Sequence, residues 1–234
     1  MAVSVTLSAN AGISLCINDK KIWIDALHNN AVAGFSTVSP ELLAQMSRHE
    51  AFRAPDVICC THCHLDHYSK ELVGRARQQW PQAELILPQR EFSDQILVEG
   101  ESMSVQAGGV ELRFFALPHE DVKYEEVPHY GAVITVDGVS VLVTGDCEMA
   151  SPKLAQQIQG LSLDLALIDF PWITLPKGRE FIREHINSNH LLIYHLPFAE
   201  DDRWGYRAAA ERCVKLLETE DIRLLYAPLQ TELF

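Results

Sequence analysis

The sequence lacks the features that mark membrane, secreted and repetitive proteins. No apolar run approaches the ~20 residues needed to span a bilayer. Residues 1–16 lack a basic segment followed by a long apolar one, so we expect no secretory leader. No low-complexity segment, repeat array or linker interrupts the chain, and its length is routine for one α/β domain. We therefore expect a single domain over residues 1–234.

Positive charge is scarce, and the cysteines do not form a disulfide framework. The chain has 19 Lys and Arg against 32 Asp and Glu, and a net charge of −13 disfavours nucleic acid as a partner. Six cysteines are too few for a disulfide scaffold of this length, and the adjacent Cys59 and Cys60 lie in an apolar run typical of a buried strand. We expect packed thiols, a cytoplasmic location, no membrane association and a small-molecule substrate, and we leave open a homo-oligomer.

Expected strands and helices alternate along the whole chain. Alternating apolar runs predict hairpins that turn at Asn18-Asp19, Gly108-Gly109 and Asp137-Gly138. Further strands are expected at 56–60, 83–88, 163–170, 190–196 and 222–227, and helices from Ser39-Pro40 and at 69–80, 151–159, 178–187 and 204–218. This order predicts an α/β (α+β) fold with mixed sheets covered by helices, two layers of each.

The segment "THCHLDHY", residues 61–68, follows one of these strands and contains three histidines and an aspartate. His62, His64 and Asp66 alternate, so an extended backbone would project their side chains to one side, and His67 adds a nitrogen from a neighbouring direction. Imidazole nitrogens and carboxylate oxygens suit zinc and similar metals. The plain alternative is a histidine-rich surface turn. Structural zinc is disfavoured because Cys63 is the one cysteine at hand and points away from His62 and His64.

The motif "THCHLDH" resembles the His-x-His-x-Asp-His signature of the metallo-β-lactamase fold superfamily, and the likeness covers nearly the whole chain. The chain looks most similar to small metal-dependent hydrolases of the ascorbate-phosphate lactonase type. The resemblance implies a four-layer αββα sandwich, in which two mixed β-sheets are flanked by helices. It also implies two metal ions between the edges of the sheets.

The resemblance assigns further site residues by their order along the chain. Asp25, which ends "KIWID", matches an aspartate that orients the metal-binding loop. His119 in "FFALPHED" matches the next ligand, with His129 in "EEVPHYGAV" as a competitor. Asp146 in "VTGD" matches a bridging carboxylate, and His195 in "HLLIYHL" matches the last ligand. Each residue taken alone has a plainer explanation, as a strand-end aspartate, a turn or a core histidine.

The implied ligand set is complete, which favours a catalytic site. One metal would be held by His62, His64 and His119, and the other by Asp66, His67 and His195, with Asp146 shared. We expect two divalent ions, zinc first, with manganese or iron as alternatives. Such a pair lowers the pKa of a bridging water towards neutrality, so that a metal-bound hydroxide attacks a carbonyl or phosphoryl centre, with Asp66 as a catalytic proton acceptor. We predict a binuclear metal-dependent hydrolase for a small ester, lactone or phosphoester. The alternative is a non-catalytic metal-binding or sensing domain.

Three further residues are candidates for contact with the substrate: His28, His129 and Tyr194. Surface exposure or simple packing is the alternative for each of them. We interpret residues 171–179 as a rigid substrate-side loop with an exposed aromatic side chain, Trp172, and two nearby cations. The acidic loop at 120–126 would repel an anionic substrate, or is simply a solvated loop.

Overall fold

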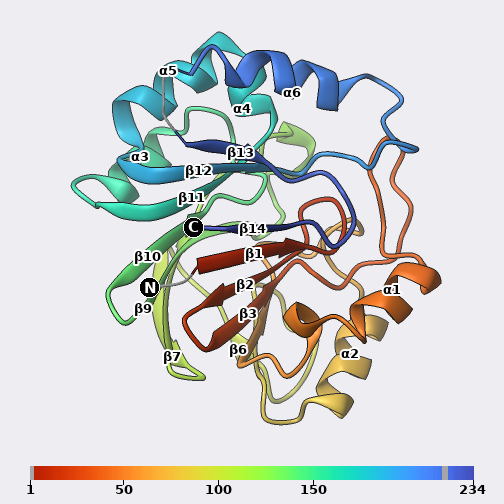
Figure 1. The fold of residues 1–234 in the computed structure, drawn as a ribbon. Coiled ribbons are helices and arrows are strands. Elements are labelled where there is room, and N and C mark those ends of the chain that lie inside the picture. Colours follow the sequence, from red (N-terminus) through yellow and green to blue (C-terminus); the bar gives the residue numbers. More distant parts are fainter. Residues whose placement is uncertain (1–2, 218–220) are drawn as a thin grey trace.

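Two seven-stranded β-sheets pack face to face in the computed structural model, which describes residues 3–217 and 221–234. Helices α1 and α2 cover the outer face of the first sheet, and α3 to α6 cover that of the second (Figure 1). The predicted four-layer αββα sandwich of mixed sheets is confirmed. Within the described residues, no helix combines the length and apolar character needed to cross a membrane.

The first sheet has the strand order β14-β1-β2-β3-β4-β5-β6. Strands β1 to β3 are antiparallel neighbours along the chain, and β14 pairs antiparallel with β1. Strands β3 to β6 run parallel, with α1 and α2 as crossovers. The strands are β1 (Val3–Leu7), β2 (Ile13–Ile17), β3 (Lys20–Ile24), β4 (Val57–Cys59), β5 (Glu84–Leu87), β6 (Ile96–Leu97) and β14 (Thr231–Leu233). The helices are α1 (Pro40–Met46), the 3-10 turn η1 (Glu50–Phe52) and α2 (Lys70–Gln79).

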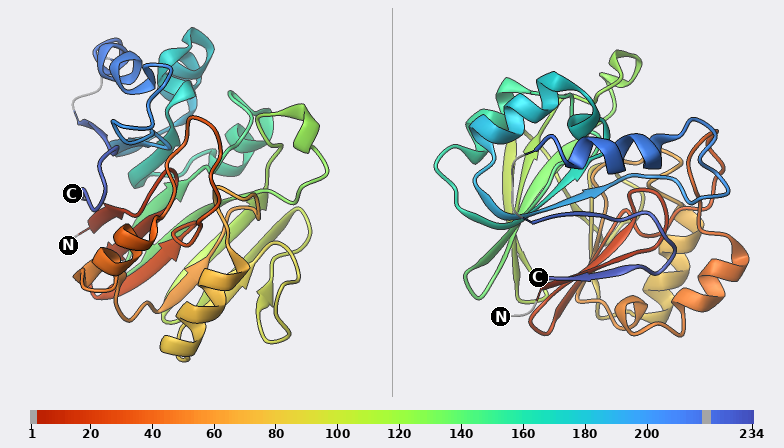
Figure 2. Two further views of the ribbon diagram at one scale, coloured as in Figure 1. Left: turned by 90° about the vertical axis from the view of Figure 1, so that its right-hand side faces the viewer. Right: turned by 45° about the horizontal axis from the view of Figure 1, so that its top comes forward.

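The second sheet repeats this pattern with the order β13-β12-β11-β10-β9-β8-β7. Strands β7 to β10 are antiparallel and β10 to β13 are parallel, and the helices between them lie on one face (Figure 2). The strands are β7 (Ser102–Ala107), β8 (Val110–Ala116), β9 (Tyr130–Val136), β10 (Val139–Val143), β11 (Leu163–Asp169), β12 (Ser188–Tyr194) and β13 (Ile222–Leu224). The helices are η2 (Val122–Tyr124), α3 (Pro152–Ile158), α4 (Pro171–Thr174), α5 (Pro176–His185) and α6 (Tyr206–Val214).

Side-chain alternation gives each strand of the second sheet two buried faces. In β11, Leu165 and Leu167 pack towards the first sheet, whereas Ala166 and Ile168 pack under the helices. Cys59 and its neighbour Cys60 are both buried in the core, as predicted. Because both faces of these strands are buried, their sequences are nearly continuous apolar runs.

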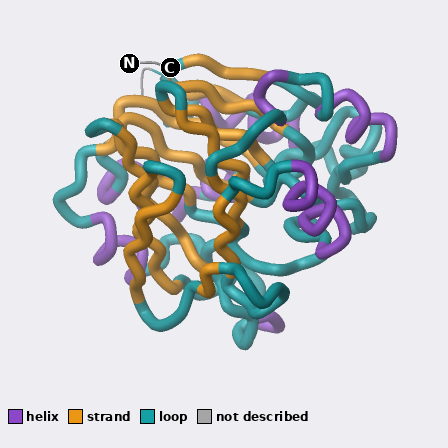
Figure 3. Tube along the Cα trace, turned by 90° about the horizontal axis from the view of Figure 1, so that it is seen from below, coloured by secondary structure: helices purple, strands orange, loops and turns teal. Residues whose placement is uncertain are grey.

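The two ends of the chain lie side by side, because β14 adds to the outer edge of β1 (Figure 3). The backbone N–H of Phe234 donates to the carbonyl of Val3 at 2.8 Å. Neither β1 nor β14 was anticipated from the sequence, nor was the two-residue β6. The three predicted hairpin turns are confirmed, with Asn18 and Asp137 in the left-handed region at φ 56° and 50°.

Two expectations about the second half of the chain are wrong. Residues 171–179 are helical: Pro171 and Pro176 occupy the first positions of α4 and α5, where a missing N–H costs nothing. Trp172 is fully buried rather than exposed. The helix expected at 204–218 spans only Tyr206–Val214, and the last residue of that expectation, 218, lies outside the described residues.

Candidate metal centre

The sequence places polar residues just beyond the carboxyl ends of several strands that point the same way. Asp25 follows β3, and the "THCHLDHY" segment follows β4 in the first sheet. In the second sheet, His119 follows β8, Asp146 follows β10 and His195 follows β12. Carboxyl ends of parallel strands share one edge of a sheet, which is where α/β folds place their sites. The two such edges meet, and their side chains converge.

The "THCHLDHY" segment is a turn rather than an extended strand. The backbone N–H groups of His67 and Tyr68 both donate to the carbonyl of His64, at 3.0 and 2.8 Å. Ser69 then caps α2 by accepting from the Leu72 N–H. The turn directs His64 to one group of converging side chains and Asp66 and His67 to another. Convergence therefore comes from reversal of the chain and not from the alternation that the sequence suggested.

The first group of converging side chains is His62, His64 and His119. One ligand atom from each lies within 4.8 Å of the others, and the ring centroids are 4.5 to 5.1 Å apart. The Nε2 atoms of all three are buried without a hydrogen-bond partner. Buried polar atoms are normally satisfied, so three unsatisfied nitrogens aimed at one point fit the ligands of a cation.

The second group is Asp66, His67 and His195, again with ligand atoms within 4.8 Å of one another. The Nε2 atoms of His67 and His195 lie 3.3 Å apart, a spacing that a shared cation would relieve. Three donors of imidazole and carboxylate type leave room for further ligands, as catalytic metal sites do.

Asp146 lies between the two groups. Its Oδ2 is 3.1 Å from His67 Nε2 and 3.8 Å from both His62 Nε2 and His119 Nε2. Its Oδ1 is 3.7 Å from His195 Nε2 and has no hydrogen-bond partner. One carboxylate therefore faces both groups, which is the geometry that a bridging ligand requires. The structure brings together all seven predicted ligands, and that they bind metal remains a prediction.

The protonation of the site follows from burial and from the two buried carboxylates. Burial lowers the pKa of His62 well below its usual value and also lowers the pKa of His64 and of His119. Burial opposes the charge on His67 too, but the Asp146 and Asp25 carboxylates outweigh it and raise the pKa of His67 well above its usual value. The first group is consequently neutral at pH 7, with lone pairs free to bind a cation.

Asp25 contacts the turn at residues 61–68, and the role of this turn in metal binding stays a prediction. Asp25 is completely buried, and its two oxygens accept from the Thr61 N–H at 2.8 Å, the Thr61 hydroxyl at 2.7 Å and His67 Nδ1 at 3.0 Å. The His67 contact holds the proton on Nδ1, so Nε2, which faces the site, is the nitrogen that would give up its proton to bind a cation. Asp25 itself lies in the left-handed region at φ 51°.

Asn10 and Asp169 also belong to the site, although the sequence did not single them out. Asn10 is buried between β1 and β2, and its Nδ2 donates to Asp66 Oδ2 at 3.2 Å. The same Nδ2 lies 3.3 Å from His195 Nε2. Asp169, the last residue of β11, places Oδ1 3.5 Å from His195 Nδ1. Burial and the neighbouring Asp146 and Glu120 raise the pKa of Asp169 well above its usual value.

The three residues predicted to contact substrate do not line the cavity above the metal centre, which corrects that expectation. His28 is completely buried, and its Nε2 lies 3.1 Å from the Ala9 carbonyl. His129 is buried behind the His62 and His119 rings, so His119 rather than His129 is the converging residue. Tyr194 packs in the core between the sheets. Burial lowers the pKa of both His28 and His129 to about 4.

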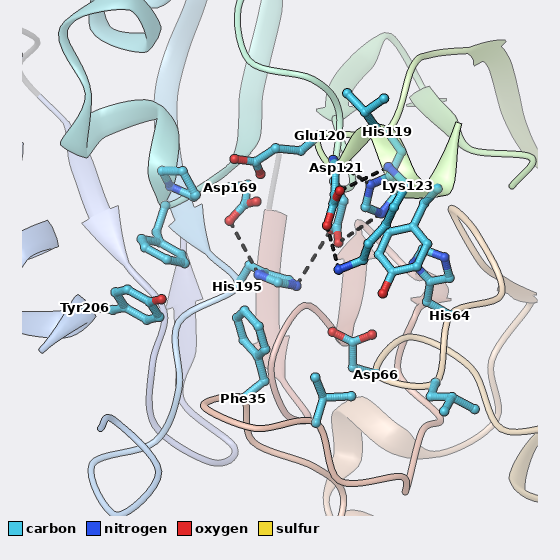
Figure 4. A pocket seen from close by; sticks show the side chains of 17 residues that line it. Phe35, His64, Asp66, His119, Glu120, Asp121, Lys123, Asp169, His195 and Tyr206 are labelled. Carbon is cyan, nitrogen blue, oxygen red and sulfur yellow. Dashed lines mark hydrogen bonds and ion pairs between the residues drawn. The ribbon is translucent and has the colours of Figure 1, made fainter. Parts of the chain in front are cut away.

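A cavity of about 850 Å³ opens over the metal centre (Figure 4). The sticks of Figure 4 show Asp66, His64, His119 and His195 around its floor and Glu120 pointing towards Asp169. The wall residues outside the predicted ligands are Val32, Phe35, Leu65, Glu120, Asp121, Val122, Lys123, Tyr124, Asp169, Phe170, Pro171 and Tyr206. The volume suits a small-molecule ligand.

Solved structures share this architecture at low sequence identity. Igni18, a metallo hydrolase from Ignicoccus hospitalis, is 15% identical with a TM-score of 0.67, covering 100% of this chain and 99% of its own. The isothiocyanate hydrolase from Delia radicum gut bacteria is 16% identical with a TM-score of 0.66, covering 100% and 99%. CmlA, a diiron β-hydroxylase from Streptomyces venezuelae, is 14% identical with a TM-score of 0.66, covering 99% of this chain but only 54% of its own.

These likenesses concern the fold, and a comparison with curated proteins gave no match. The sequence itself matches the profile of the beta-lactamase superfamily domain over residues 21–191, which is most of the chain. That span includes six of the seven converging side chains, and His195 follows four residues after it. The narrower likeness to the ascorbate-phosphate lactonase type stays a prediction. Because its sequence matches this profile, the chain belongs to the beta-lactamase superfamily, and it has the metallo-β-lactamase fold.

Proposed function

We propose that the protein is a binuclear metal-dependent hydrolase that cleaves a small ester, lactone or phosphoester. The observation that carries this proposal is the convergence of two three-residue donor groups on one shared carboxylate, Asp146, at the floor of a cavity. A binding or sensing domain would need neither a second donor group nor an open cavity above both groups. The structural neighbours named as hydrolases support the same class.

The donor set fits two divalent cations. His62, His64 and His119 would hold the first, and Asp66, His67 and His195 the second, with Asp146 between them. We expect zinc, and manganese or iron as alternatives, because nitrogen and oxygen donors accept all three. The diiron centre named for CmlA supports iron as one candidate on this fold. When bound, such a pair supplies Lewis acidity that polarises the substrate and makes water a stronger acid.

The protein's own groups orient the reaction and move the proton. Asp66 faces the cavity, and Asn10 holds its Oδ2 by donating at 3.2 Å, so the carboxylate keeps one fixed orientation. Asp66 is placed to accept the proton of the attacking water and to return it to the leaving group. Asp25 accepts a hydrogen bond from His67 Nδ1 and so fixes the tautomer of His67. These contacts hold the site before substrate arrives, which lowers the cost of reaching the transition state.

The test is hydrolysis by an Asp146→Ala variant, with Asp19→Ala as the matched control. Asp19 lies exposed in the β2–β3 turn, so its replacement removes the same carboxylate far from the site. Wild type and the control should cleave an aryl ester, a lactone or bis(p-nitrophenyl) phosphate after metal reconstitution, and Asp146→Ala should not. Equal activity of Asp146→Ala, with its fold retained by circular dichroism, would rule out the bridging role.

The six cysteines are all free thiols, and three of them, Cys59, Cys60 and Cys147, are buried. We propose on this ground that the protein works in a reducing compartment, the cytoplasm.

A further inference from the structure

The cavity has apolar walls on two sides of the metal centre. On one side, the Phe170 and Tyr206 rings pack 4.7 Å apart, and Phe35 lies against His195 with ring centroids 4.9 Å apart. Figure 4 shows Phe35 and Tyr206 on the His195 side of the cavity, across from His64. These three rings come from the loop after β3 and from the starts of α4 and α6, so separate elements build one aromatic wall.

The opposite wall is built from the segments after β4 and β8. The Tyr124 ring lies 4.2 Å from His64 and 5.2 Å from His119, centroid to centroid. Leu65 and Val122 also line the cavity, yet they are 61% and 75% exposed to solvent. Large aliphatic side chains left this exposed beside a catalytic floor gain stability when an apolar ligand covers them.

The charge in the walls is negative. Glu120, Asp121 and Asp169 line the cavity in addition to the predicted ligands. Lys123 is the single lysine or arginine among the described lining residues, and its Nζ lies 2.6 Å from Asp121 Oδ2. That exposed ion pair sets the Lys123 charge against Asp121, so the described wall residues include no unpaired lysine or arginine to receive a carboxylate, a sulfonate or a second phosphate oxygen. An anionic group on the substrate would instead face Glu120.

We propose that the cavity takes an uncharged substrate with an apolar or aromatic group beside the scissile bond, and that it discriminates against anionic substrates. This inference rests on the proposed function and narrows it to neutral carboxylic esters and lactones. In that reaction water adds its oxygen to the acyl carbon, the bond from the acyl carbon to the leaving oxygen breaks, and the proton passes to the leaving alcohol. The reaction needs no further co-reactant.

The test compares two aryl esters that differ only at the far end of the acyl chain. 4-Nitrophenyl hexanoate ends in a methyl group, and mono-4-nitrophenyl adipate has a carboxylate in its place. Each kcat/KM is divided by the uncatalysed rate of the same ester at pH 8. We expect the reconstituted enzyme to favour the hexanoate by tenfold or more. Equal values, or a preference for the adipate, would overturn the inference while leaving the hydrolase proposal intact.

Matched variants locate the discrimination in the cavity wall. Glu120→Gln and Glu126→Gln each remove one negative charge from the same loop, but only Glu120 lines the cavity. Glu120→Gln should reduce the preference for the hexanoate several-fold, mainly through a lower KM for the adipate. Glu126→Gln should leave the ratio unchanged. Equal effects of the two variants would assign the discrimination to the net charge of the protein and contradict the inference.

Ligand binding separates failure of this inference from failure of the proposed function. N-phenyl-1-naphthylamine is neutral, and 8-anilinonaphthalene-1-sulfonate carries the same rings with a sulfonate. The metal-loaded protein should bind the neutral dye tenfold more tightly, and Phe35→Ala should weaken that binding, whereas Phe92→Ala, outside the cavity, should not. If this holds and no ester is cleaved, the hydrolase proposal fails and the ligand class stands. Tighter binding of the sulfonate, or no effect of Phe35→Ala, would overturn the ligand class.

Discussion

Replacing Asp25 with asparagine should weaken cation binding at the second metal position, although the two side chains have nearly the same volume. The Asp25 carboxylate accepts three hydrogen bonds, from the Thr61 N–H, the Thr61 hydroxyl and His67 Nδ1, at 2.8, 2.7 and 3.0 Å. The amide oxygen of the asparagine still accepts from the Thr61 N–H. The Thr61 hydroxyl can rotate to accept a hydrogen bond from the amide NH2 group. The amide NH2 group, however, faces His67 Nδ1 as a donor, so Nδ1 must accept and the proton moves to Nε2. A protonated Nε2 cannot bind a cation.

The expected size follows from two effects. Losing an orienting partner of a metal-ligating histidine typically weakens metal affinity by about 10- to 100-fold, or roughly 1.4 to 2.7 kcal/mol. Replacing charge-assisted hydrogen bonds to a buried carboxylate with neutral ones to an amide lowers the free energy of unfolding of the metal-free protein by roughly 1 to 2 kcal/mol.

Zinc titration of metal-free Asp25→Asn against a competing chelator measures the first effect, and urea unfolding measures the second. The matched control is Asp56→Asn, because Asp56 also accepts a backbone hydrogen bond, from Lys21 N–H at 2.9 Å, but outside the site. The control should bind two ions as the wild type does. If Asp25→Asn binds the second ion with unchanged affinity, then Asp25 does not set the tautomer of His67, and the reasoning is refuted.

Three further predictions concern Asn10, His28 and Gly145. Asn10→Ala removes the hydrogen-bond donor at 3.2 Å from Asp66 Oδ2. The affinity for the second cation should therefore fall roughly tenfold in the zinc titration. An unchanged affinity would exclude a positioning role for Asn10. His28 has a folded-state pKa of about 4, below its unfolded value near 6.5, so the unfolded chain binds more protons between these pH values and stability falls as pH drops through that window. His28→Gln should remove about 2 kcal/mol of this acid sensitivity between pH 7 and pH 5, measured by urea unfolding of the metal-free protein at pH 7, 6 and 5. Equal pH slopes of the variant and the wild type would contradict the assignment. Gly145 has φ 56°, and an added Cβ would lie 2.7 Å from His129 Nε2. Gly145→Ala should therefore lower the free energy of unfolding by about 2 kcal/mol or more. A change under about 0.5 kcal/mol would contradict this prediction and show that the turn relaxes.

The sequence predicts the parts of this site that follow directly from strand ends. The "THCHLDHY" segment, Asp25, His119, Asp146 and His195 each come just after an apolar run. Strands that point the same way bring such ends to one edge, and the resemblance to the superfamily picked out these residues by their order along the chain. Resemblance to the superfamily then decided between His119 and His129, and the structure agrees with that choice.

The rest depends on contacts between distant segments. Asn10 reaches Asp66 only because β1 lies beside β2 in the first sheet, and β1 is itself completed by β14 from the other end of the chain. A three-residue strand such as β14 carries no periodic signal of its own. Burial of His28 and Tyr194 likewise depends on tertiary packing. Proline misled the prediction at residues 171–179, because it marks a loop and a first helical turn equally well.

The measurement that tests the central claim most directly is metal content per chain by inductively coupled plasma mass spectrometry, on protein purified without a metal-affinity tag. The account predicts about two zinc, manganese or iron ions per chain in the wild type, and fewer in Asp146→Ala, whose carboxylate faces both donor groups. About one ion in the wild type would leave the first group to bind alone. No bound metal in the wild type, even after reconstitution with each of the three ions, would contradict the account.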